Sequence, residues 1–230
     1  MLTYLQSFNM RGLKLEKSFE KEKIVYTTSS GNLYPLEVGL SSLEVRLIPH
    51  NKADGTKRCS ECSVYGRSGA CPPYSDDFAC LQHHFTNMAV LYIKLNTCDY
   101  PSKSLHGKHY VRWNFTETFM PQLLAKLVVS LSNHLSGLPL GSGRCKSCRT
   151  CHTQKENGPC IHPHRRLQSL EAVGVNVSEL MASLASIPLQ WWDRQNNNYI
   201  PEYQVRVGGI LHNQSACSIR LLEYPSNIIR

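Results

Sequence analysis

The sequence predicts a single compact domain of the α+β class, or of the related α/β class, that carries two cysteine-rich loops. Three observations lead to this prediction. The chain of 230 residues is long enough to bury a full hydrophobic core. Short apolar runs typical of strands alternate loosely with amphipathic helical patterns. Nine of the ten cysteines fall between Cys59 and Cys160. We interpret residues 1–230 as one metal-binding domain, with cysteine loops at residues 59–80 and 145–163.

The first half of the chain predicts two strands and a short helix. Residues 43–48 read as a strand, and residues 51–56 read as a polar turn. Ser75 is a candidate N-cap, because two acidic residues follow it where a first helical turn would lie. Apolar residues then lie on one face of the predicted helix: Phe78, Leu81, Phe85 and Met88. Residues 89–95, AVLYIKL, read as a buried strand.

The second half contains the clearest helix of the sequence, at residues 116–135. Its apolar residues recur at steps of three and four and include Phe119, Leu123, Leu124, Leu127, Val128, Leu131 and Leu135. Gly137 and Pro139 mark its end. Further on, Ser178 is a candidate N-cap for a helix that runs to about Ser186, and residues 203–211 alternate as a strand does.

The second cysteine block reads CKSCRTCHTQKENGPCIHP and begins at Cys145. Its first three cysteines are each separated by two residues, and the fourth follows after eight more. A C-x2-C-x2-C run places three thiolates around an iron–sulfur core, and a distant cysteine supplies the fourth ligand. Zinc is more often held by separated C-x2-C pairs. The spacing therefore favours an iron–sulfur cluster bound by Cys145, Cys148, Cys151 and Cys160.

The first cysteine block repeats part of this pattern. The shared spacing is C-x2-C-x8-C, formed by Cys59, Cys62 and Cys71 in the first block and by Cys148, Cys151 and Cys160 in the second. A glycine lies two residues before the last cysteine in each block, Gly69 in one and Gly158 in the other. Glycine lets the backbone turn sharply and bring N–H groups toward the sulfur atoms. We interpret the two loops as two versions of one binding device.

The two blocks differ in the fourth ligand. Block two has Cys145 before the shared pattern, whereas block one has no equivalent. Its fourth ligand is either Cys80 or no cysteine at all. Four thiolates suit electron transfer, while an iron with an open position can bind a substrate as a Lewis acid. Zinc remains an alternative for block one, because a C-x2-C pair and two later cysteines also satisfy tetrahedral coordination.

Other residues near the blocks receive more ordinary interpretations. Cys98 and Cys217 stand alone, and we interpret them as small buried hydrophobic residues. His162 is expected to hydrogen-bond near block two rather than to bind metal. Tyr65 and Arg67, inside block one, are expected to pack against their surroundings.

The formal charge of +8 suggests at first an anionic partner such as nucleic acid. Deprotonating eight cysteines onto two clusters, each with a core charge of about +2, would leave about −2 per cluster and an excess of only about +4. Part of the basic charge lies beside the cysteines, as at Arg144, Lys146 and Arg149. A nucleic-acid partner is therefore not expected.

The N-terminal residues 1–17 contain no apolar stretch long enough for a signal peptide or a membrane span. The expected location is cytoplasmic, and no membrane span is expected. Thiols stay reduced in that compartment, so the dense cysteines indicate metal or redox chemistry rather than disulfides.

Two segments of the chain resemble a family of predicted metal-binding proteins of otherwise undefined function. They are CSECSVYGRSGACPP at residues 59–73 and GSGRCKSCRTCHTQKENGPCIHPHRRLQSLEAVGVNV at residues 141–177. The family pattern has C-x2-C, Tyr-Gly and Cys-Pro-Pro, followed by C-x2-C-x2-C, a further cysteine and Ser-(Met/Leu)-Glu-Ala. The resemblance implies seven ligands: Cys59, Cys62, Cys71, Cys145, Cys148, Cys151 and Cys160. It gives no support to Cys80. Ile161 and Gln168 depart from the pattern, which has a basic residue and a proline there.

We interpret the chain as an iron–sulfur protein of an anaerobic type of metabolism. It would bind two 4Fe–4S clusters and transfer electrons to or from a partner enzyme. One alternative is an enzyme whose block-one cluster keeps an open iron for a small substrate, positioned by Arg67, Arg112 or a histidine. Another is a zinc-binding structural or RNA-interaction module. The sequence predicts neither the substrate, the redox partner, the cluster potential nor the oligomeric state.

Overall fold

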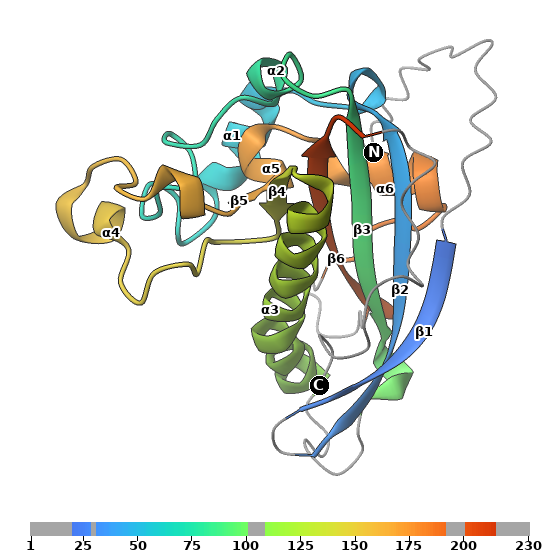
Figure 1. The fold of residues 1–230 in the computed structure, drawn as a ribbon. Coiled ribbons are helices and arrows are strands. Elements are labelled where there is room, and N and C mark those ends of the chain that lie inside the picture. Colours follow the sequence, from blue (N-terminus) through green and yellow to red (C-terminus); the bar gives the residue numbers. More distant parts are fainter. Residues whose placement is uncertain (1–19, 29–30, 101–108, 192–200, 215–230) are drawn as a thin grey trace, which may run out of the picture.

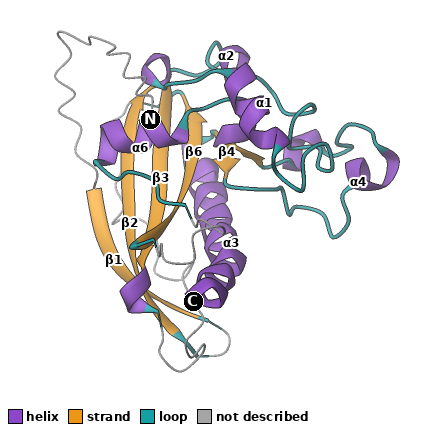
Figure 2. Ribbon diagram, turned by 180° about the vertical axis from the view of Figure 1, so that it is seen from behind, coloured by secondary structure: helices purple, strands orange, loops and turns teal. Residues whose placement is uncertain are grey.

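A computed structural model describes residues 20–28, 31–100, 109–191 and 201–214. Within these ranges the chain forms one mixed sheet with helices on both faces, as Figures 1 and 2 show from opposite sides. Most neighbouring strands are antiparallel, and the helices are not regularly interleaved with them. The predicted α+β class is confirmed.

Six strands form the sheet, in the spatial order β1-β2-β3-β6-β4-β5. Their bounds are β1 Glu20–Thr27, β2 Leu33–Glu44, β3 Asn87–Asn96, β4 Leu138–Gly141, β5 Gln168–Ser169 and β6 Tyr203–His212. All neighbours pair antiparallel except β4 and β5, which are parallel. The short strands β4 and β5 thus form one edge, and β1 forms the other.

The helices cover the two faces of the sheet unequally. Their bounds are α1 Lys52–Ser60, α2 Phe78–Leu81, α3 His109–Leu135, α4 His152–Glu156, α5 Leu170–Val173 and α6 Val177–Ala185. The long helix α3 lies on one face, while α6 lies on the opposite face (Figures 1 and 2). No helix in the described part of the chain has the length and apolar content needed to cross a bilayer.

The central strand β3 contributes to a hydrophobic core on each side of the sheet. Its odd-numbered residues from Ala89 to Leu95 pack with α3, and its even-numbered residues from Met88 to Tyr92 pack with α5 and α6. Successive side chains of a strand point to opposite faces. Because both faces are covered, the strand is apolar throughout rather than alternating.

The cysteine loops project from the end of the molecule near β4 and β5. Figure 1 shows the loop after α1 beside the segment that contains α4, although these segments are far apart in the sequence. The two loops are in contact, since a Cβ atom added to Gly69 would lie 2.5 Å from Cys160 Cβ. The sheet edge therefore carries a lobe built from both cysteine blocks.

Several predicted elements are confirmed with small changes in their bounds. The strand predicted at residues 89–95 lies within β3, and that at residues 203–211 lies within β6. The helix predicted at residues 116–135 lies within α3. The helix predicted from Ser178 is α6, but its N-cap is Asn176, whose side chain accepts a hydrogen bond from the Glu179 N–H.

Three local predictions are wrong. Residues 43–48 are not one strand, because β2 ends at Glu44 and a 3-10 turn follows. The polar residues 51–56 begin helix α1, since the Asn51 side chain caps it by accepting from two backbone N–H groups. Asp77, rather than Ser75, caps α2, and this helix is shorter than predicted, because it ends at Leu81. Phe85 lies beyond it and Met88 belongs to β3.

Candidate metal centre

The first cysteine block begins in the last turn of α1, which contains Cys59. Tight turns follow, in which the Cys62 N–H donates to Cys59 O at 2.9 Å and the Cys71 N–H donates to Ser68 O at 2.9 Å. Cys59, Cys62 and Cys71 all line one cavity of about 510 Å³. The turns therefore bring three thiols to the wall of a common space.

The second block lines a neighbouring cavity of about 540 Å³. Its wall includes Cys145, Cys148 and Cys151. Both cavities are lined in part by Val64 and Arg144. The two sets of cysteines thus face adjacent spaces that share part of their walls.

Cys160 and Cys151 meet at Gly69 of the other block. A Cβ atom on Gly69 would lie 2.5 Å from Cys160 Cβ, 2.9 Å from Cys160 Cα and 2.8 Å from Thr153 Oγ1. The Gly69 N–H also forms a hydrogen bond with the Cys151 sulfur. Glycine is required at position 69 because the blocks approach each other so closely there. Block two is thus held partly by a residue of block one.

Backbone N–H groups donate to sulfur atoms of block two. The Leu167 N–H donates to Cys145 Sγ at 3.4 Å, and the His162 N–H donates to Cys160 Sγ at 3.4 Å. Hydrogen bonds of this kind stabilise negative charge on sulfur. His162 therefore does contact block two by hydrogen bonding, through its backbone.

Cys151 has the most favourable surroundings for a thiolate. Burial tends to raise the pKa of its thiol, but N–H groups of Gly69, Gln154 and Thr153 outweigh this effect and lower the pKa. Cys151 is the N-cap residue of α4, so its sulfur lies at the end of a helix where free N–H groups point outward. The thiolate is the form that binds metal.

In block one, burial favours the protonated thiol at Cys59 and Cys71. Burial raises the pKa of Cys71 to about 11. Burial also raises the pKa of Cys59, and the Glu171 carboxylate acts in the same direction. Without a metal these two thiols keep their protons at neutral pH, and a metal must displace the protons to bind.

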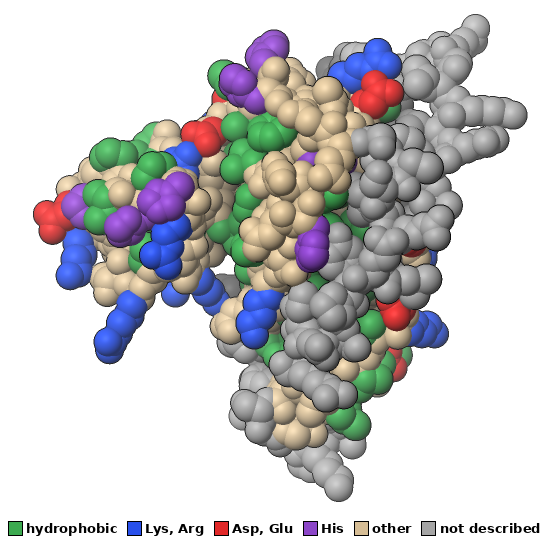
Figure 3. Space-filling model, in the orientation of Figure 1, with side chains coloured by type: hydrophobic (Ala, Val, Ile, Leu, Met, Phe, Trp, Pro, Cys, Tyr) green, Lys and Arg blue, Asp and Glu red, His purple; other side chains and the backbone are tan. Residues whose placement is uncertain are grey.

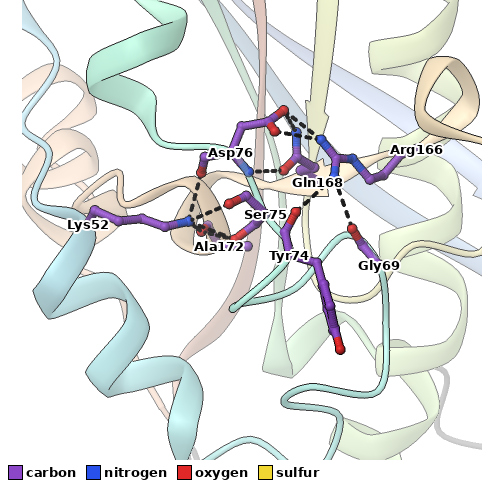
Figure 4. A network of polar contacts seen from close by, with 8 residues as sticks. All are labelled: Lys52, Gly69, Tyr74, Ser75, Asp76, Arg166, Gln168 and Ala172. Atoms are coloured by element: carbon purple, nitrogen blue, oxygen red, sulfur yellow. Dashed lines mark hydrogen bonds and ion pairs between the residues drawn. The ribbon is translucent and has the colours of Figure 1, made fainter. Parts of the chain in front are cut away.

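Arg166 connects the two blocks through a dense set of hydrogen bonds, shown in Figure 4. Its guanidinium donates to Gly69 O at 3.2 Å, to Tyr74 O at 2.9 Å and to both Asp76 carboxylate oxygens at 2.7 Å. Gln168 Nε2 donates to Asp76 Oδ2 at 2.6 Å, and the Asp76 N–H donates to Gln168 Oε1 at 2.7 Å. A two-pronged Arg–carboxylate pair fixes orientation as well as distance. The segments 69–76 and 166–168 are therefore held in one relative position.

Lys52 makes a second connection, on the other side of Asp76 (Figure 4). Its ammonium donates to Ser75 Oγ at 2.7 Å, to Asp76 O at 2.7 Å and to Ala172 O at 2.6 Å. Burial lowers the pKa of Lys52, while nearby Asp77 and Asp76 act to raise it. The side chain joins α1, α5 and the segment before α2. Ser75, expected to cap a helix, instead donates its own hydroxyl to Ala172 O.

Cys80 lies apart from the other predicted ligands. It is exposed on α2 and lines neither of the two cavities. Cys98 is also exposed, in the turn Thr97–Asp99, so its interpretation as a buried residue is wrong. Cys217 and the side chain of Arg112 lie outside the described residues.

Residues other than cysteine complete the two cavities. Tyr65 lines the block-one cavity, whereas Arg67 is exposed and lines the block-two cavity, so the expectation that Arg67 packs is wrong. Figure 3 shows Lys, Arg and His side chains gathered on the lobe that carries the cysteines. Arg144, Lys146 and Arg149 are exposed and line the block-two cavity. The surface around block two is therefore positively charged.

Sequence reasoning missed a polar group on the wall of the block-one cavity. It comprises Ser169, Glu171, Arg58 and Arg206. Burial raises the pKa of the Glu171 carboxyl, while its own N–H, the Ser169 hydroxyl, Arg206 and Arg58 act to lower it. The only sequence signal for this group was the Ser-Leu-Glu-Ala motif, which gave no indication that its glutamate lies near Cys59.

The nine described cysteines are all free thiols. Over the ranges that the structure describes, no three Cys, His, Asp or Glu side chains are close enough together to hold a single metal ion. Cys59, Cys62 and Cys71 share one cavity wall, and Cys145, Cys148 and Cys151 share the other. Cys160 lines neither cavity and lies beside Gly69, next to this second group.

Comparison with known proteins gave one match. The model of a family described as predicted metal-binding protein (DUF2284) matches residues 44–211, a segment that contains both cysteine blocks. Neither the curated proteins nor the solved structures contain a match to the chain.

Proposed function

The chain belongs to the DUF2284 family of predicted metal-binding proteins, and from this premise we propose that its metal is iron, held as two 4Fe–4S clusters that exchange electrons with a partner enzyme. The observation that carries the proposal is the arrangement of the cysteines around two adjacent cavities with shared walls. Iron–sulfur clusters supply one-electron transfer when bound.

The donor atoms fit this cofactor in both cavities. Thiolates are the soft ligands that iron–sulfur clusters take. In block two we assign four ligands: Cys145, Cys148, Cys151 and Cys160. In block one we assign three: Cys59, Cys62 and Cys71. The N–H groups that donate to Cys145 and Cys160 suit cluster ligands, because hydrogen bonds to sulfur tune the reduction potential.

The surrounding charge also supports the proposal. The block-two cluster, with four thiolates, would carry about −2, and the block-one cluster, with three, about −1, as each core has a charge of about +2. The basic residues Arg144, Lys146 and Arg149 can offset that charge and attract an acidic partner. Free thiols suit a reducing compartment, so we propose that the protein is cytoplasmic. We also propose that residues 1–230 act as one domain.

Metal analysis tests the proposal. Protein purified without oxygen is expected to hold about eight irons and a similar amount of sulfide per chain, where one cluster would give about four. Reduction with dithionite should produce the paramagnetic signal of reduced clusters. Zinc without iron and sulfide would overturn the proposal and favour the structural zinc module.

Single cysteine variants assign each cluster to its block. Cys62→Ser and Cys148→Ser are each expected to lose about half of the iron, and the double variant nearly all of it. Cys98→Ser is the matched control, because Cys98 is exposed and lines neither cavity. Equal loss of all iron in both single variants would argue for one shared centre instead of two.

A second candidate function is favoured by the block-one cavity. Its wall contains three cysteines, so one iron of a cubane cluster there would lack a thiolate ligand. An enzyme that binds a small substrate at this iron would use such a position. Substrate-dependent changes in the spectrum of only the block-one cluster, measured in Cys148→Ser protein, would distinguish this function from electron relay.

A further inference from the structure

The missing fourth ligand of block one leads to an inference that rests on the function proposed above. Cys59, Cys62 and Cys71 face a cavity that Cys80 does not line. Glu171 lines the same cavity. The cavity wall therefore includes a residue with a carboxylate oxygen donor as well as the three cysteines.

Backbone packing fixes this arrangement. Helices α1 and α5 approach closely because glycines lie between them: a Cβ atom on Gly55 would lie 2.8 Å from Glu171 O, and one on Gly174 would lie 2.8 Å from Lys52 Cα. Cys59 follows Gly55 by one helical turn, so the two share a face of α1. Cys59 and Glu171 are thus brought together by the contact of their helices, independently of any metal.

The Glu171 carboxyl already has local partners at the start of α5, namely its own N–H and the Ser169 hydroxyl, but it is not part of a capping box. The N-cap of α5 is Ser169, whose hydroxyl accepts from the Ala172 N–H, so Ala172 occupies the position where a capping-box glutamate would bond back. Glu171 also lines the cavity. Arg58 and Arg206 lie on the same wall and can compensate the charge of an anionic centre.

We propose that the Glu171 carboxylate is the fourth protein ligand of the block-one cluster. Three thiolates and one carboxylate around a core of about +2 give a centre of about −2, which Arg58, Arg144 and Arg206 on the cavity wall can balance. A carboxylate is a harder ligand than a thiolate, so it binds this iron less firmly. The same iron is then the one that an external ligand would reach by displacing Glu171.

Glu171→Gln tests the assignment, since the amide keeps the shape of the side chain and removes its anionic oxygen. Iron content is expected to fall from about eight to about seven per chain, and mild oxidation should produce the paramagnetic signal of a three-iron cluster at about one spin per chain. Glu171→Cys supplies a thiolate at the same position. It is expected to retain about eight irons and to show no three-iron signal.

Two matched variants complete the experiment. Glu61→Gln removes another carboxyl group from the same cavity wall, and Cys80→Ser removes the competing thiol; neither is expected to change the iron content or the signal. Eight irons and no three-iron signal in Glu171→Gln would overturn the inference, as would a three-iron signal in Cys80→Ser. Wild-type protein without iron would overturn the proposed function itself, so the two failures are distinguishable.

Discussion

At the scale of single residues, Gly69 and Gly158 occupy equivalent positions in the two blocks but have different surroundings. A Cβ atom on Gly69 would lie 2.5 Å from Cys160 Cβ, whereas the nearest atom to a Cβ on Gly158 is His152 Nε2 at 3.7 Å. Gly69→Ala is therefore expected to destabilise the fold by about 1–3 kcal/mol and to lower cluster occupancy of both blocks, because the loops must move apart. Chemical denaturation and iron analysis measure these effects.

Gly158→Ala is the internal control for that prediction. Its added methyl group makes only ordinary van der Waals contact, so stability and iron content should stay close to those of the wild type. Equal losses in the two variants would mean that the contact between Gly69 and Cys160 is not what holds the loops together.

The surroundings of single thiols also predict their reactivity in metal-free protein. Burial raises the pKa of Cys71 to about 11, whereas hydrogen bonds from Gly69, Gln154 and Thr153 overcome burial and lower that of Cys151. At pH 8, roughly one Cys71 in a thousand is then a thiolate. Iodoacetamide should modify Cys151 first, and the rate at Cys71 should keep rising up to about pH 11. Peptide mass spectrometry measures the modification of both sites. Faster modification of Cys71 than of Cys151 at pH 8 would contradict the predicted difference in their pKa values.

Residue types and spacing pointed to six cysteines that line the two cavities, because metal ligands obey short-range rules, but Cys160 and Cys80 from the same predicted set line neither. The same rules did not predict that Glu171 and Arg166 belong to the site. Glu171 reaches Cys59 through the contact between α1 and α5, and Arg166 bonds to segment 69–76 across the sequence. Such partners depend on tertiary packing, which spacing within one block does not encode.

At the scale of the elements, Arg166 is the side chain that holds segment 69–76 against the segment before β5. Arg166→Lys keeps the charge but loses the forked geometry that reaches Gly69, Tyr74 and Asp76 together. We expect a loss of stability of about 2 kcal/mol and slower reconstitution of both clusters. Urea denaturation and the time course of iron uptake provide the two measurements.

Arg165→Lys is the matched substitution at the neighbouring position. Arg165 is exposed in the 3-10 turn Pro163–Arg165, so the same chemical change should alter stability by less than about 0.5 kcal/mol. If Arg166→Lys behaved like Arg165→Lys, the network in Figure 4 would contribute little to holding the loops.

Periodicity predicted the elements that are long and well packed, namely α3, β3 and β6. It failed for short elements that depend on their neighbours. Helix α1 is polar in sequence and relies on the Asn51 cap and on contact with α5. In β2, the buried residues Tyr34, Leu36, Val38 and Leu40 do alternate, but Pro35 and Gly39 are residues that usually interrupt strands.

At the scale of the whole molecule, the hydrophobic core lies on both faces of the sheet, whereas the lobe that carries the cysteines lies at the edge formed by β4 and β5. Apart from Phe78, the buried residues of the two hydrophobic clusters on either side of β3 lie outside the cysteine loops 59–80 and 145–163. The loops attach near β4 and β5, while β1 forms the opposite edge. If the protein relays electrons as we propose, its partner would contact the lobe.

The charge of that lobe predicts how the reduced protein reacts with small redox reagents. Lys146 and Arg149 are exposed beside the block-two cavity, so anionic ferricyanide should be attracted and its rate of electron uptake should fall as ionic strength rises. The double variant Lys146→Gln, Arg149→Gln should lower the rate with ferricyanide roughly fivefold at low salt. It should not lower the rate with cationic hexaamminecobalt. Lys21→Gln with Lys23→Gln removes the same charge from exposed positions on β1 and should change neither rate. Stopped-flow absorbance measures both reagents at matched iron content. Equal slowing by the two double variants would mean that electrons leave through another surface.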